Sequence, residues 1–187
     1  MTKKHDNRAA LELADAYWRD AQDYLQRYQF TVNSDERDYW SIKSRRMKAY
    51  IDLRFAIETI LKSKICLSTG AGTSGEDVLR ELRALGHNIG ALVQRSGLAL
   101  TDDLAQALAS CERAPVHWRY EAEAREARAQ DERDYYATVG DDAWMRKVET
   151  FAENQVKAID QELKSYSGIV SGSELLDEIM ARAKGTT

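Results

Sequence analysis

The sequence has one proline, two cysteines and three histidines in 187 residues. The single proline, Pro115, permits long uninterrupted helices and argues against a turn-rich β-sandwich or barrel. Cys66 and Cys111 are too few for a disulfide framework, which indicates a reduced, cytoplasmic protein. The first residues lack the apolar core of a signal peptide, and no run approaches the about 18 apolar residues that span a bilayer, so no membrane partner is expected.

Metal and cofactor signatures are also missing. No two of the three histidines (His5, His87 and His117) lie four residues apart on one helix, and the sequence has no Glu-x-x-His motif. We therefore expect no metal site and no cofactor. Glycines 70, 72 and 75 satisfy G-x-G-x-x-G, but a helix rather than a strand is predicted before them. We therefore interpret this segment as an interhelical loop that ends in a capping box of Thr73 and Glu76. The net charge of −4 argues against a protein that coats duplex nucleic acid.

The sequence does contain long stretches in which apolar residues recur every three or four positions. They predict an all-α fold: an up-and-down bundle of four core helices (residues 6–125) with a C-terminal helical extension packed on it (residues 126–187). The predicted helices span 6–30, 35–67, 75–96, the residues between Thr101 and Pro115, 142–166, and a short segment after Ser171.

Local signals refine these helices. Ser34, Thr101 and Asp141 are predicted N-caps. Residues 50–65 are apolar on more than one face, which predicts a central helix packed on two sides. Gly86 indicates either a close helix crossing or a joint before His87. The charged segment 119–136 is predicted to be an exposed helix followed by a loop, because arginines are interleaved with its carboxylates.

The most basic stretch lies early in the second predicted helix. Its cations are Lys43, Arg45, Arg46 and Lys48, and Trp40 and Tyr50 flank them. Basic side chains beside aromatic rings can bind phosphates and stack on bases, so these four residues are candidate nucleic-acid contacts. In the alternative interpretation the aromatic rings lie in the core and the cations are simply solvated.

Several short motifs occur in a suggestive order. YIDLRFAIETILKSKI (residues 50–65) is followed by Gly86-His87-Asn88-Ile89 and then by Trp118-Arg119-Tyr120. Over about residues 8–125 this order resembles the HEPN (higher eukaryote and prokaryote nucleotide-binding) superfamily. His87, Asn88, Arg119 and Tyr120 match its motif positions. Glu121 departs from the proline that often follows the Arg-Tyr pair.

The resemblance implies a binding or accessory domain that acts with RNA, a nucleotide or a nucleotidyltransferase-type partner, and that forms a homodimer. Four aromatic residues of segment 6–30 also favour a dimer: Tyr17, Trp18, Tyr24 and Tyr28. Ribonuclease members of the family use an Arg and a following His from each of two protomers, without metal. Arg80 and His87 give one nominal match, and their spacing places them about two helical turns apart on nearly one face. In the alternative interpretation His87 orients its helix by a hydrogen bond and has no catalytic role. A metal-independent ribonuclease is therefore one alternative, and a purely structural helical module is another.

Overall fold

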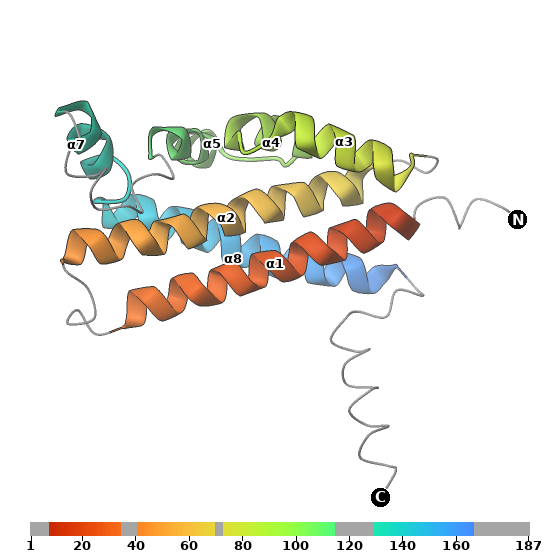
Figure 1. Cartoon of the computed structure of the whole chain (residues 1–187), viewed down its shortest axis with the longest axis horizontal. Helices are drawn as coiled ribbons and strands as arrows, with labels where there is room; N and C mark the ends of the chain where they lie inside the picture. Colours follow the sequence, from red (N-terminus) through yellow and green to blue (C-terminus); the bar gives the residue numbers. More distant parts are fainter. Residues whose placement is uncertain (1–7, 35–40, 70–72, 115–128, 167–187) are drawn as a thin grey trace, which may run out of the picture.

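A computed structural model describes residues 8–34, 41–69, 73–114 and 129–166. Within these ranges every regular element is a helix, which confirms the predicted all-α fold (Figure 1). The elements are α1 (Arg8–Asn33), α2 (Ile42–Ser68), α3 (Gly75–Leu85), α4 (Ile89–Ser96), α5 (Asp102–Ala109), the 3-10 helix η2 (Ser110–Arg113), α7 (Ala129–Tyr136) and α8 (Asp142–Ser165). No helix among the described residues has both the length and the apolar character needed to cross a bilayer.

Helix α2 lies at the centre of the bundle. It packs along α1 over most of its length, and α4 and α8 also contact it, while α3 lies against α1 (Figure 1). The six consecutive residues 56–61 are all buried, and six consecutive residues of an α-helix point to every side of it. The prediction of a central helix packed on more than one side is therefore confirmed.

Two of the four aromatic residues that favoured a dimer lie inside this single chain. Trp18 is buried and donates a hydrogen bond from Nε1 to the carbonyl oxygen of Val156, at 3.0 Å. Tyr28 is buried as well. Tyr17 and Tyr24 stay partly exposed, and Tyr24 packs on Phe55 with the ring centroids 5.3 Å apart. Packing within the monomer thus accounts for half of the aromatic surplus, and the homodimer stays a prediction.

Helix α8, which belongs to the predicted extension, packs on both α1 and α2. The predicted boundary between 125 and 126 and the short helix predicted after Ser171 lie outside the described residues. The division into a bundle and an extension therefore stays a prediction.

Most differences from the sequence prediction concern helix ends. Helix α2 begins at Ile42 with Ser41 as its N-cap, so the predicted start at 35 with Ser34 as the cap is wrong. The Ser34 hydroxyl instead donates to the carbonyl oxygen of Thr31 at 2.6 Å, at the end of α1. Either serine can cap a helix, and local sequence does not distinguish between them.

The caps of the later helices were predicted with more success. Thr101 accepts a hydrogen bond from the Leu104 amide and Asp141 accepts one from the Ala143 amide, which confirms both N-caps. The α3 cap is shifted by one residue from the predicted Thr73, because Ser74 accepts from the amide of Asp77 at 3.1 Å.

The predicted helix 75–96 is two helices joined at Gly86. Helix α3 ends at Leu85, and Gly86 has a φ of 60°, a left-handed conformation that favours glycine. Asn88 then caps α4 by accepting a hydrogen bond from the Ala91 amide at 2.8 Å. A Cβ atom at Gly86 would meet no close neighbour, so the joint, and not a close helix crossing, explains the glycine.

Residues 129–136 form α7, where a loop was predicted. Two apolar residues anchor this segment despite its charged sequence: Tyr135 in the last turn is buried, and so is Val139, three residues after the helix ends. Packing of an aromatic ring against the bundle stabilises a short helix that its polar residues alone would not specify.

Candidate functional site

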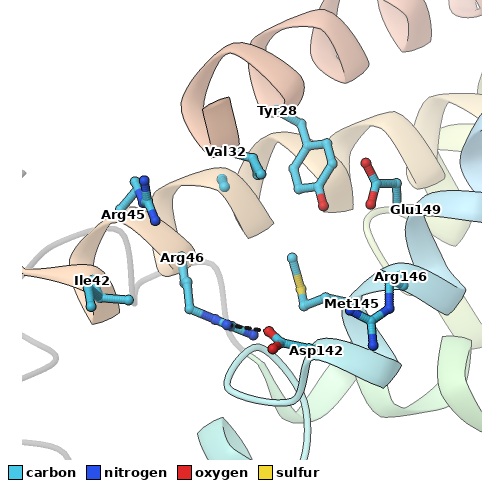
Figure 2. A pocket seen from close by; sticks show the side chains of 10 residues that line it. Tyr28, Val32, Ile42, Arg45, Arg46, Asp142, Met145, Arg146 and Glu149 are labelled. Carbon is cyan, nitrogen blue, oxygen red and sulfur yellow. Dashed lines mark hydrogen bonds and ion pairs between the residues drawn. The ribbon is translucent and has the colours of Figure 1, made fainter. Parts of the chain in front are cut away.

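A cavity of about 200 Å³ opens where the C-terminal end of α1, the N-terminal half of α2 and the N-terminal half of α8 meet (Figure 2). Part of its wall is apolar and comes from all three helices: Val32, Ile42, Ala49 and Met145. Val32 and Ile42 are among the few large apolar side chains that are exposed in the described chain. A small ligand can therefore bury an apolar surface here.

Three arginines line this pocket, and two of them are held by the protein. Arg46 forms an ion pair from Nη1 to Oδ1 of Asp142 at 2.5 Å, and its Nε donates to the Val139 carbonyl oxygen at 2.8 Å. The hydrogen bond that Asp142 accepts from Arg46 lowers the pKa of the Asp142 carboxyl. Arg45 donates to the Ser34 carbonyl oxygen at 2.9 Å.

The third arginine, Arg146, comes from α8 and is exposed. It has neither a hydrogen bond nor an ion pair with any residue that the structure describes. A guanidinium group offers five N–H donors in a planar fork that matches a carboxylate or a phosphate. Arg146 therefore leaves one such fork available at the pocket.

Glu149 and Tyr28 face each other at one end of the same pocket (Figure 2). Tyr28 is 3% exposed, and burial together with the Glu149 charge raises the pKa of its hydroxyl. Burial also raises the pKa of the Glu149 carboxyl, while the hydrogen bond with Tyr28 opposes that rise. Within the described chain no cation forms an ion pair with Glu149. The half-buried Glu149 carboxylate can therefore accept further hydrogen bonds, beyond the one from Tyr28, that no described residue donates.

Replacing Glu149 with glutamine is expected to raise the melting temperature at neutral pH. Burial places the pKa of this carboxyl above its unfolded value, so its contribution to stability is fully present below the unfolded pKa and is lost as the pH rises through the folded pKa. Glutamine carries no charge and still accepts the Tyr28 hydrogen bond. Thermal unfolding of both proteins from about pH 3 to pH 8 should show a gain that disappears at the acidic end. A variant that is less stable at pH 7 would contradict this reasoning.

The pocket includes two of the four predicted nucleic-acid contacts. Arg45 and Arg46 line the pocket, whereas Lys43 and Lys48 do not. The Lys43 ammonium lies 4.8 Å from the centre of the Tyr135 ring, on the side of α7. Tyr50, proposed as a stacking partner, is fully buried against Trp144 and cannot reach a base. Nucleic-acid contact by the four cations stays a prediction.

Sequence reasoning missed the other half of the pocket. Arg146 and Glu149 were not singled out, and Tyr28 was considered only among the aromatic residues that favoured a dimer. Arg146 and Glu149 lie three residues apart on a helix that was predicted correctly, so they share one face. Their spacing could have predicted that they lie on the same face of the helix, but it does not predict which other helix that face packs against.

A second polar cluster ties α2 to the joint between α3 and α4. Arg54 is buried and donates to the carbonyl oxygens of Cys111 at 2.5 Å and His87 at 3.3 Å. It also pairs with Glu112 at 3.4 Å, whose second carboxylate oxygen accepts from the Ile89 amide at 2.6 Å. Arg54 and Glu112 therefore fix the N-terminus of α4.

His87 belongs to this cluster through Glu58. The Glu58 carboxylate is buried, and Nδ1 of His87 lies 2.9 Å from both of its oxygens. Lys62 pairs with the same carboxylate at 2.6 Å. The His87 side chain is otherwise 75% exposed, so this contact anchors the joint at its surface.

The structure changes the geometry expected for the ribonuclease motif. Because α3 ends at Leu85, Arg80 and His87 do not share a helical face, and that expectation is wrong. Arg80 is exposed and pairs with Asp77 at 2.9 Å and Glu76 at 3.7 Å. Of the other family-motif residues, Asn88 caps α4, while Arg119 and Tyr120 lie outside the described residues.

The two cysteines behave as apolar core residues. Cys66 and Cys111 are both fully buried and unpaired. Burial raises the pKa of each thiol to about 12, so neither is a thiolate near neutral pH. Nucleophilic chemistry at either sulfur is disfavoured.

Comparisons of the chain with protein-family models, with curated proteins and with solved structures find no match. The resemblance to the HEPN superfamily therefore rests on its short motifs alone, and membership stays a prediction.

Proposed function

We propose that this chain is a binding or accessory domain that acts with a nucleotide or with RNA, and that Arg146 holds a phosphate group at the α1–α2–α8 pocket. The observation that supports this is the exposed guanidinium of Arg146, which makes no hydrogen bond or ion pair in the described chain and lies beside an apolar wall. Phosphate accepts two parallel hydrogen bonds from such a group.

The size and charge of the site favour a small ligand over a duplex. The pocket holds about 200 Å³, and the chain as a whole carries a net charge of −4. A free nucleotide, or one nucleotide of a single-stranded RNA, places a phosphate at the mouth and its base against Met145 and Val32. Lys43 and Lys48 remain candidates for contacts with a longer RNA.

As an accessory domain, the chain would supply its bound nucleotide to a partner enzyme. In the interpretation that the HEPN-like motifs favour, a homodimer presents the bound nucleotide to a nucleotidyltransferase-type partner. Copurification with such an enzyme, lost when the pocket is altered, would support this arrangement.

Replacing Arg146 with alanine is expected to weaken nucleoside monophosphate binding about ten- to a hundredfold, because a charge-assisted hydrogen bond contributes about 1.5–3 kcal/mol. Lys157→Ala is the matched control, since Lys157 is an exposed cation of α8 outside the pocket. Calorimetric titration at low and moderate salt measures both variants, and the Arg146 variant should also show a smaller salt dependence.

Three results would count against this proposal. Equal losses in the two variants would mean that the pocket is not the site. Absence of nucleotide and RNA binding by the unaltered protein at low salt would favour a purely structural module. Cleavage of RNA in the presence of EDTA, abolished by His87→Ala, would replace the binding role with the metal-independent ribonuclease.

A further inference from the structure

The phosphate-binding role leaves one feature of the pocket without a use, the Glu149 carboxylate. Arg146 and Glu149 lie one turn apart on α8, yet they form no ion pair, and Figure 2 shows their charged groups extending in different directions. A ligand bound along this face can therefore meet a guanidinium with one end and a carboxylate with the other.

The surroundings of Glu149 restrict what it can bind. Tyr28 occupies part of its hydrogen-bonding capacity, and the remaining oxygen lone pairs face a pocket whose nearby wall is Met145. An ionised carboxylate only accepts hydrogen bonds. Its complement is therefore a group with two adjacent N–H donors, set on a flat apolar body that fits beside the thioether.

Among the common bases only guanine has such an edge. Its ring N1–H and its exocyclic amino group lie side by side and match the two oxygens of a carboxylate. Adenine and cytosine place an acceptor nitrogen next to their amino group, and the N–H of uracil lies between two carbonyl oxygens. Each of the three sets a lone pair against the carboxylate, which is unfavourable in a partly desolvated site.

We infer that this pocket selects a guanine nucleotide, with Glu149 on the base and Arg146 on the phosphate. The inference rests on the proposed function, because it names the base of the nucleotide proposed to bind there. Binding N–H donors also stabilises the ionised carboxylate, which offsets its partial burial.

The test compares GMP, IMP and AMP as ligands of the full chain by calorimetric titration. IMP is guanosine monophosphate without the exocyclic amino group, so the GMP and IMP pair probes the contact without any change to the protein. We expect GMP to bind about tenfold more tightly than IMP and more tightly still than AMP, because an unsatisfied polar group in the site penalises the wrong base.

The protein side of the test uses Glu149→Gln, with Glu153→Gln as the matched control. Glu153 lies one turn further along α8, outside the pocket, and accepts a hydrogen bond from Gln29 that glutamine can keep. Glu149→Gln should weaken GMP binding about tenfold, whereas AMP should bind equally well or better, because the acceptor nitrogen of adenine no longer meets a carboxylate and can accept from the glutamine amide. The control should change neither ligand.

The outcomes separate the two proposals. Equal binding of GMP, IMP and AMP, all lost in Arg146→Ala, would overturn the guanine inference and leave the proposed function standing. Parallel losses of GMP and AMP binding in Glu149→Gln would also overturn it, since they would indicate a structural effect. If neither a nucleotide nor RNA binds, both proposals are wrong.

Discussion

Replacing Ile57 with alanine is expected to lower the free energy of unfolding by about 3 kcal/mol. Ile57 is fully buried near the middle of α2, the helix that α1, α4 and α8 all contact. Shortening the side chain removes buried apolar surface and leaves a cavity, because three packed neighbours cannot all move inward to fill it.

Urea denaturation followed by circular dichroism measures the effect. Ile57→Val should cost about 1 kcal/mol, which grades the loss by volume. Phe30→Ala is the control: Phe30 is also a large apolar side chain on the bundle, but it is 76% exposed, so its truncation should change stability by less than about 0.5 kcal/mol. If Ile57→Ala costs no more than Phe30→Ala, α2 is not the core of the bundle.

The helices could be predicted well because their signals are local. Apolar residues at helical spacing gave α8 as 142–166 against the observed Asp142–Ser165, with its cap at Asp141. Residues 50–65 were assigned to the centre of the bundle because a helix that is apolar on several faces must be covered on several sides.

Local signals fail where two candidates are equivalent or where an anchor comes from elsewhere. Ser34 and Ser41 are both competent caps, and only packing of the first turn of α2 decides between them. Helix α7 depends on the burial of Tyr135 against other elements, which a charged sequence does not reveal.

The candidate site was half predicted for the same reason. The basic segment was visible as a run of cations, and it contributes Arg45 and Arg46 to the pocket. That Arg46 would meet Asp142, and that Arg146 would complete the pocket, depends on how α8 docks on α2. Contacts between residues about a hundred positions apart cannot be predicted from periodicity. Periodicity shows which face of a helix is buried, but not which helix packs against that face.

Replacing Arg54 with methionine is expected to lower the free energy of unfolding by about 3 kcal/mol, although methionine keeps most of the apolar length of the side chain. Arg54 is 6% exposed and serves three acceptors: the carbonyl oxygens of Cys111 and His87, and the Glu112 carboxylate. Hydrogen bonds to a charged donor contribute more than neutral ones, and their loss leaves acceptors in a partly dry region.

The damage should be largest at one place. Glu112 accepts from the Ile89 amide at the start of α4, and Arg54 holds Glu112 in position, so without Arg54 the joint at Gly86 should open more often. Hydrogen exchange should therefore accelerate for the amides of residues 88–92 well before it does so in α8.

Two further variants test whether charge or geometry matters at this position. Arg54→Lys keeps the charge but cannot reach three acceptors at once, so it should recover less than half of the loss. Arg8→Met is the surface control, because Arg8 pairs with Glu12 in full view of solvent, and it should cost less than about 0.5 kcal/mol. Full recovery by lysine would mean that the positive charge alone stabilises the cluster, and uniform exchange along the chain would mean that Arg54 supports the whole bundle and not the α3–α4 joint.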